Sequence, residues 1–305
     1  LLRDGDGDGT YEDRTVFADD LNAPYGLALV DNDLYVANQD ALVRFDYEAG
    51  QRKASGPPDV VTPLPARINH HWTKALTASP DGEYLYVGIG SNSNITERGM
   101  EAEVDRAEIW EIDPETGAHR AYATGLRNPT ALTIQPGTDQ LWAVVNERDE
   151  LGPDVPPDYM TAVEDGGFYG WPYSYWGDQV DERVEPQRPD LVARALIPDY
   201  ALGPHTASLG LAAAEGNTLP TRFAHGMFVG QHGSWNRTTP VGARVMVTFI
   251  DAEGNASTEP FAEGWIDENE EYLGRPVDVA QLRDGSIIVS DDLAGALYRI
   301  WYEGN

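Results

Sequence analysis

The stretch Leu76-Thr77-Ala78-Ser79-Pro80-Asp81-Gly82-Glu83-Tyr84-Leu85-Tyr86-Val87 predicts two β-strands joined by a tight turn. Its central Ser, Pro, Asp and Gly favour chain reversal, and its flanks are apolar or aromatic, as in strands. Stretches of the same form occupy residues 26–37, 131–144 and 277–290, and a fifth copy is expected from Leu209 to Gly230. The repeat therefore favours an all-β protein built from similar sheets.

The copies recur at intervals of roughly 50 residues, a spacing typical of the blades of a β-propeller. Strands that complete individual blades are expected at residues 41–45, 107–112 and 296–300. We predict a six-bladed β-propeller, although residues 160–200 are too irregular to assign. Thr15–Ala18 is expected to pair with the last blade and close the ring, which removes exposed sheet edges. Residues 1–305 are predicted to form a single domain, with residues 1–13 as an N-terminal acidic loop.

The charge balance is strongly acidic, with 51 acidic and 21 basic residues and a formal net charge of −30. The chain has only two lysines, Lys53 and Lys74. This charge repels nucleic-acid phosphates and anionic membranes, which argues against both as partners. Dense hydrated carboxylates are typical of a surface adapted to high salt, where ions screen their repulsion. An ordinary acidic secreted protein is the alternative.

The sequence contains no cysteine, which excludes disulfides, zinc–thiolate sites and thiol nucleophiles. No apolar run approaches the roughly 18 residues that span a bilayer, so direct membrane insertion is not expected. The sequence begins at Leu1 without a secretion signal, which a processed or trimmed start would explain.

An acidic loop stands near the N-terminus, where Asp4, Asp6 and Asp8 alternate with glycines. Alternating carboxylates on a tight loop can wrap oxygens around a hard cation such as calcium. The final acid of a helix–loop–helix calcium site is missing, so Glu12 or Asp13 would have to complete the shell. A structural calcium site and a solvated acidic turn both remain open.

Two adjacent histidines, His70 and His71, come just before the inner strand of a predicted blade, near the mouth of the propeller channel. An imidazole at this place could act as a general base or as a metal ligand. Adjacent loop histidines also occur simply as hydrogen-bonded structure. The other histidines show no zinc-ligand spacing.

Two further groups of residues are expected at blade ends, where rigid strands position the loops. Arg127 and Asn128 precede Pro129, and an arginine on a proline-stiffened turn suits a planar carboxylate, although a salt bridge between blades would suit it as well. Glycines with clustered aromatic residues at 165–173 fit either a flat ligand surface or ordinary blade packing.

Taken together, these motifs resemble the soluble quinoprotein sugar dehydrogenases, in particular the glucose/sorbosone dehydrogenase group. The resemblance runs over nearly the whole chain and rests on five ordered strings. These are His71-Trp72-Thr73 nine residues before Pro80-Asp81-Gly82, Gly125-Leu126-Arg127-Asn128-Pro129, Asn146-Glu147-Arg148-Asp149, Gly167-Phe168-Tyr169-Gly170-Trp171-Pro172, and Gly274-Arg275-Pro276.

The resemblance implies a six-bladed propeller with pyrroloquinoline quinone lying over the channel mouth and a calcium ion bridging it to the protein. His71 is similar to the family's general base, and Arg127 with Asn128 to the pair that holds the quinone. The backbone carbonyls of Arg148 and Asp149 correspond to calcium ligands, but the Gly-Pro often found there is absent. Further cofactor-facing residues implied are Arg275, His232, Arg237, Thr206, Asn22 and Lys74.

The activity so implied is oxidation of the C1 hydroxyl of an aldose or related sugar by hydride transfer to the quinone, with an external electron acceptor. The alternatives are a calcium-dependent propeller lactonase or other hydrolase, and a non-catalytic binding propeller. An extracellular, periplasmic or cell-surface location in a salty medium is expected. The sequence leaves the oligomeric state open.

Overall fold

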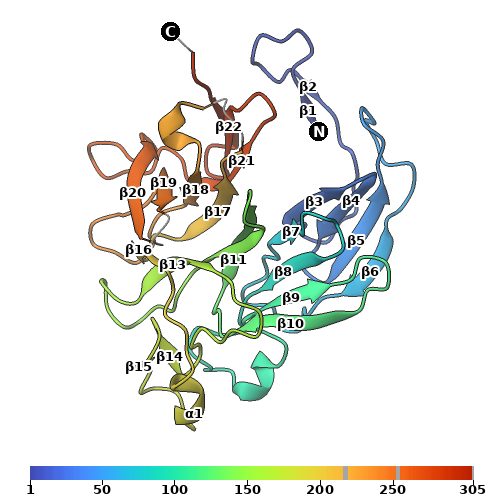
Figure 1. The fold of residues 1–305 in the computed structure, drawn as a ribbon. Helices are drawn as coiled ribbons and strands as arrows, with labels where there is room; N and C mark the ends of the chain where they lie inside the picture. The colour runs from blue at the N-terminus through green and yellow to red at the C-terminus, as the bar shows by residue number, and fades with distance from the viewer. Residues whose placement is uncertain (216–218, 252–254, 304–305) are drawn as a thin grey trace.

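The computed structural model describes residues 1–215, 219–251 and 255–303. In Figure 1 its sheets stand around a common centre, with both chain ends at the same side. The first sheet contains β3 (Gly26–Val30), β4 (Asp33–Ala37), β5 (Ala41–Asp46) and β6 (Asp59–Pro63). The second contains β7 (Leu76–Ala78), β8 (Leu85–Ile89), β9 (Glu108–Ile112) and β10 (His119–Thr124).

The third sheet contains β11 (Pro129–Gln135), β12 (Gln140–Val145), β13 (Pro157–Ala162) and β16 (Tyr200–Pro204). The fourth contains β17 (Ser208–Ala213), β18 (Gly226–Gln231), β19 (Arg244–Ile250) and β20 (Ala256–Ala262). The fifth contains β21 (Pro276–Gln281), β22 (Ile287–Asp291) and β23 (Ala296–Ile300). All pairs are antiparallel, and the innermost strands β3, β7, β11, β17 and β21 are neighbours in that order.

The strand pairs follow from the predicted repeat. In the second sheet Leu76 lies opposite Val87 and Ala78 opposite Leu85, in the register that the turn between them imposes. Gly82 has φ = 74°, a conformation that favours glycine, and the Asp81 carboxylate accepts the Glu83 N–H. Leu85, Val87 and Ile89 are fully buried between sheets. The predicted all-β propeller class is confirmed.

The number of blades differs from the prediction, because the described residues form five sheets of three or four strands and not six. Residues 163–199 build an insertion between β13 and β16, with the hairpin β14 (Ser174–Tyr175)–β15 (Gln179–Val180) and the helix α1 (Pro189–Val192). Figure 1 shows this insertion projecting below the ring. It has its own small core of Phe168, Tyr173, Val184 and Val192, so its apolar residues do not alternate as a blade requires.

The predicted ring closure by Thr15–Ala18 is also wrong, since these residues form no strand. The Phe17 ring packs edge-on against Phe45 at 5.8 Å, and its carbonyl accepts the Ala54 N–H, both at the first sheet. The N-terminus instead forms a separate hairpin of β1 (Leu2–Arg3) and β2 (Asp13–Arg14). The short 3₁₀ turns Met100–Glu103 and Thr221–Phe223 complete the elements, and no helix in the described ranges could cross a membrane.

Candidate active site

A cavity of about 180 Å³ lies where loops of the second, third and fourth sheets meet. Strands β7, β11, β12, β13, β17 and β18 all begin or end beside it, so the rigid sheets position its walls. Its lining residues are His71, Arg127, Asn128, Asn146, Glu147, Asp149, Asp158, His205, Ala207 and Trp235.

His71 is held on one side of its ring by Ser91. Its Nδ1 lies 2.9 Å from the Ser91 carbonyl oxygen and 3.0 Å from the Ser91 hydroxyl. A carbonyl can only accept, so Nδ1 carries the proton and Nε2 keeps its lone pair. Burial, together with the positive charge of Arg127, lowers the pKa of His71 well below its usual value. His71 is therefore a neutral imidazole that lines the cavity and keeps one basic ring nitrogen.

Gly90 allows His71 and Asn128 to approach each other. A Cβ at this position would lie 2.3 Å from Asn128 Oδ1 and 2.5 Å from His71 Cβ. Both distances are below any van der Waals contact, so no other residue fits without displacing one of these side chains. The glycine at the end of β8 is thus part of the construction of the cavity.

Arg127 is almost fully buried, at 4% exposure, and bonds mainly to backbone. Its guanidinium donates to the carbonyls of Asn94, Asn146 and Glu147 at 3.2, 3.2 and 2.8 Å. It also donates to Asn94 Oδ1 at 2.9 Å. These bonds place a fixed positive charge at the cavity wall and hold the loop after β12.

Two buried carboxylic acids, Glu147 and Asp158, line the cavity and are linked by a hydrogen bond from the Glu147 backbone to the Asp158 carboxylate. Asp158 accepts hydrogen bonds from the Glu147 N–H, the Thr206 hydroxyl and the Ala207 N–H at 2.9, 3.0 and 2.9 Å. Burial raises the pKa of Glu147 to about 8, and its Oε1 has no hydrogen-bond partner among the described residues. The cavity wall therefore contains a carboxyl group with an unused acceptor oxygen.

The loop that follows is fixed from three directions. Arg148, at 2% exposure, lies 2.9 Å from Asp181 of the insertion. The Asp149 carboxylate accepts a hydrogen bond from Asn236 Nδ2 at 2.9 Å, and His205 Nδ1 lies 3.2 Å from the same carboxylate oxygen. The carbonyl of Asp149, one of the expected calcium ligands, accepts Asn94 Nδ2 at 3.2 Å.

Several residues predicted to face the cofactor lie outside the cavity lining. Arg275 donates to the carbonyls of His232 and Gly233, and His232 Nε2 lies 2.9 Å from Asp292. Arg237 donates to the carbonyl of Pro153.

Two further predicted residues are also outside the lining. Lys74 is buried and donates to Asn69 and to the Trp72 carbonyl. Asn22 is exposed and bonds to Asp40 and Gln39. Thr206 stands behind the wall, on Asp158.

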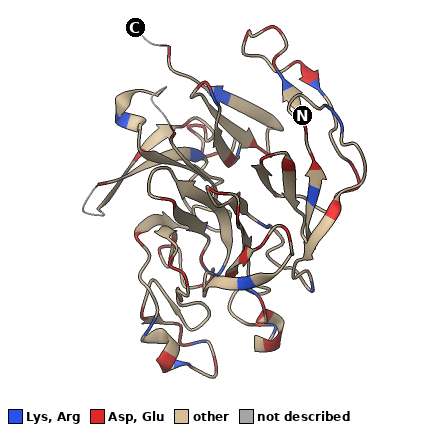
Figure 2. Ribbon diagram, turned by 45° about the vertical axis from the view of Figure 1, so that its right-hand side comes forward, with Lys and Arg blue, Asp and Glu red and all other residues tan. Residues whose placement is uncertain are grey.

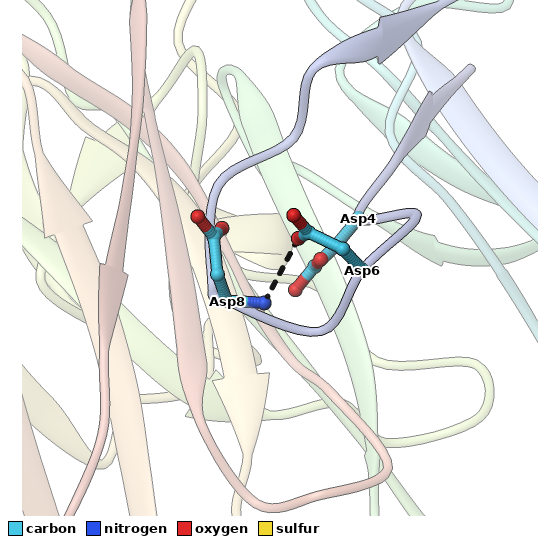
Figure 3. Close-up of side chains that lie close together, drawn as sticks. All are labelled: Asp4, Asp6 and Asp8. Atoms are coloured by element: carbon cyan, nitrogen blue, oxygen red, sulfur yellow. Dashed lines mark hydrogen bonds between the residues drawn. The ribbon is translucent and has the colours of Figure 1, made fainter.

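The acidic N-terminal loop joins β1 to β2, and none of its residues lines this cavity. Figure 3 shows Asp4, Asp6 and Asp8 close together on this loop. The carboxylate oxygens of Asp4, Asp6 and Asp8 lie within 4.8 Å of one another. Asp4 accepts the N–H groups of Gly7 and Gly9 at 2.6 and 2.8 Å. Neither acid expected to complete the shell belongs to the cluster: Glu12 accepts the Gly5 N–H, and Asp13 pairs with Arg52.

The family model described as TrAA12-like matches residues 2–158, which is more than half of the chain. The chain belongs to the TrAA12-like family. An uncharacterized protein of Borreliella burgdorferi is 28% identical over 93% of this chain and 76% of its own length. A pyrroloquinoline quinone-dependent pyranose dehydrogenase of Coprinopsis cinerea is 26% identical over 88% of this chain, and the match spans only 44% of that enzyme.

Solved structures agree with the fold of this TrAA12-like protein. The holo form of the pyranose dehydrogenase quinone domain from Coprinopsis cinerea has a TM-score of 0.81 at 21% identity, covering 97% of this chain and 86% of that one. A calcium structure of a Trichoderma reesei family AA12 enzyme has a TM-score of 0.78 at 19% identity, covering 97% and 85%. The resemblance to quinoprotein sugar dehydrogenases drawn from the motifs is confirmed at the level of the family.

The cavity of the TrAA12-like chain also contains residues to which the sequence motifs assigned no role. These are Asn146, Glu147, Asp158, His205, Ala207 and Trp235. Asn146 and Glu147 belong to a string already noted for its neighbours, and a glutamate between a buried strand and a loop was a usable signal. His205 and Ala207 flank Thr206, which the resemblance implied as a cofactor-facing residue, whereas nothing in the sequence near Asp158 marks it as a partner of His71.

Proposed function

We propose that this protein is a quinone-dependent dehydrogenase that oxidises the C1 hydroxyl of an aldose or related sugar. The observation that carries the proposal is His71, a neutral imidazole that lines a polar cavity and is held through Nδ1 by Ser91. A base of this kind accepts the hydroxyl proton as the C1–H bond breaks. The fixed charge of Arg127 disfavours protonation of His71 before substrate binds.

The residues of the cavity fit pyrroloquinoline quinone and calcium. Buried acceptor oxygens normally have partners, and Glu147 Oε1 and Asn128 Oδ1 have none among the described residues. A hard cation takes oxygen ligands, so Glu147 and the neighbouring Arg148–Asp149 backbone would hold calcium, with Arg127 and Asn128 toward the quinone. When bound, the quinone receives the hydride and calcium polarises the accepting carbonyl.

A calcium-dependent hydrolase is the rival proposal, because three carboxylates line the cavity. However, within the described ranges only Asp4, Asp6 and Asp8 form a group of three or more acidic or histidine side chains whose ligand atoms lie close together, and they are outside the cavity. The acids of the cavity are bonded to backbone and side chains instead of converging on one point. This arrangement favours the dehydrogenase.

The test is reconstitution of the protein with pyrroloquinoline quinone and calcium, followed by dye reduction with a panel of aldoses and by hydrolysis of lactones. Dye reduction that needs both additions supports the dehydrogenase. Lactone hydrolysis with calcium alone would replace it with the hydrolase, and inactivity in both assays would leave a binding propeller. We further propose a sugar substrate, an external electron acceptor and work outside the cytoplasm in a salty medium.

A further inference from the structure

Trp235 is the most exposed tryptophan of the described chain, with 75% of its surface accessible, although it stands at the wall of the cavity. Trp110, Trp142, Trp171 and Trp265 are all at most 7% exposed. An indole left in water forfeits the free energy that its burial would supply. Its exposure beside His71 and Asp149 therefore calls for a ligand that covers it.

Each of the three backbone carbonyls before Trp235 accepts a hydrogen bond from a side chain. Arg275 donates to the carbonyls of His232 and Gly233, the first at 3.0 Å, and the Tyr272 hydroxyl donates to the Ser234 carbonyl at 2.8 Å. Arg275 also stacks over the Tyr272 ring at 4.9 Å. The segment that carries the exposed indole is thus held in place by Tyr272 and Arg275, which lie just before β21 of the fifth sheet.

The residue after Trp235 is held at the cavity by its side chain, since Asn236 Nδ2 donates to the Asp149 carboxylate at 2.9 Å. Fixation on both sides lowers the conformational entropy lost when a ligand is bound. A flexible surface loop would have neither tie. The segment that carries the indole is therefore held near the carboxylate of Asp149.

The lining defines the chemistry of the ligand. Next to one apolar indole face it offers the carboxylate of Asp149, and carboxylate oxygens accept hydrogen bonds from hydroxyl groups. A pyranose ring has this dual character, with C–H bonds on its face and hydroxyls at its edge. We propose that Trp235 is the platform on which the sugar ring stacks, an inference that rests on the proposed function. Arg275 and Tyr272 are then positioning residues for that platform.

The proposal is tested with Trp235→Ala and Trp235→Phe, using Trp301→Ala as the control for an exposed tryptophan elsewhere, at 59% exposure. Aldose binding to the quinone-free protein is measured by saturation-transfer NMR titration. Trp235→Ala should weaken it roughly tenfold, the size expected of one aromatic stacking contact. Trp235→Phe should keep part of the affinity, and Trp301→Ala should match the parent. In the quinone-loaded protein, KM should rise by a similar factor with little change in kcat.

The outcomes separate this inference from the proposed function. Equal aldose affinity in the parent and Trp235→Ala would refute the proposal that the sugar ring stacks on Trp235. So would a loss of quinone affinity with unchanged aldose affinity, because the indole would then cover the flat cofactor. If aldose binding depends on Trp235 but no sugar is oxidised with quinone and calcium present, the platform stands and the dehydrogenase fails.

Discussion

His71 takes its properties from three neighbours that are far from it in sequence. Ser91 fixes its tautomer, Gly90 gives its Cβ room, and Arg127 keeps the ring neutral. Each contact acts on a different property of the same base: orientation, position and pKa. The sequence motif identifies His71 as the candidate base, whereas its neighbours set the orientation, position and pKa that a base needs.

We predict that His71→Ala leaves quinone affinity nearly unchanged and lowers turnover by a factor on the order of 10² to 10⁴, the usual contribution of a positioned base. His70→Ala is the matched control, since its ring packs edge-on against His71 at 4.7 Å without lining the cavity. Each variant is titrated with quinone and calcium before aldose oxidation is measured at saturation. Parent-like turnover of His71→Ala would refute the role of base.

The pH dependence of kcat/KM should report the lowered pKa of His71. Because burial and Arg127 disfavour the protonated ring, the base form persists as pH falls below the ordinary histidine value of 6.5. The acid limb of the profile is therefore expected below pH 6.5, and Ser91→Ala should alter it by removing the hydroxyl near Nδ1. An acid limb above pH 6.5 would contradict the assignment.

The residue roles show where sequence reasoning ends. His71, Arg127 and Asn128 were predicted at the site and do line one cavity, because short motifs at strand ends place them. Arg275, for which a cofactor-facing role stays a prediction, lies outside the cavity lining and donates to two backbone carbonyls. A long arginine side chain reaches whichever acceptors the fold brings near, and local sequence does not specify those acceptors.

At the level of elements, the predicted strand pairs formed because each pair is local. Apolar alternation and an Asp-Gly turn fix two strands and their register within about a dozen residues. The insertion at residues 163–199 could not be derived in this way. Its segment from Gly166 to Tyr169 bonds to the backbone of β10 in the preceding sheet, a pairing that depends on how the second and third sheets are placed next to each other.

The N-terminal hairpin is an element whose loop we propose to bind a structural calcium ion. Calcium should raise the melting temperature of Asp6→Ala less than that of the parent, because ligand binding to the folded state stabilises it by mass action. Turnover should persist, since the loop is not part of the cavity. Asp19→Ala removes an exposed acid outside the loop and serves as the control. Identical calcium shifts in all three proteins would mean that the loop binds no ion.

On the scale of the whole molecule, acidic residues are spread over sheets and loops with few basic residues between them (Figure 2). Ion pairs such as Arg188 with Asp190 at 2.6 Å neutralise some carboxylates locally, but 51 acidic residues against 21 basic ones leave a net charge of −30. Exposed pairs contribute little to stability, about 0–1 kcal/mol each. The remaining carboxylates repel one another in the folded state more than in the expanded unfolded chain.

We therefore predict that the thermal midpoint rises with sodium chloride from about 0.1 M to molar concentrations, where the screening length falls from about 10 Å to about 3 Å. Circular dichroism follows the unfolding. A variant with Glu83→Gln, Glu185→Gln and Glu268→Gln, all exposed, carries three fewer negative charges and should show a smaller salt slope. Its midpoint at low salt should lie above that of the parent, because the repulsion it relieves is the one that salt screens. A midpoint that stays flat or falls with salt in the parent would remove the basis for placing this protein in a salty medium.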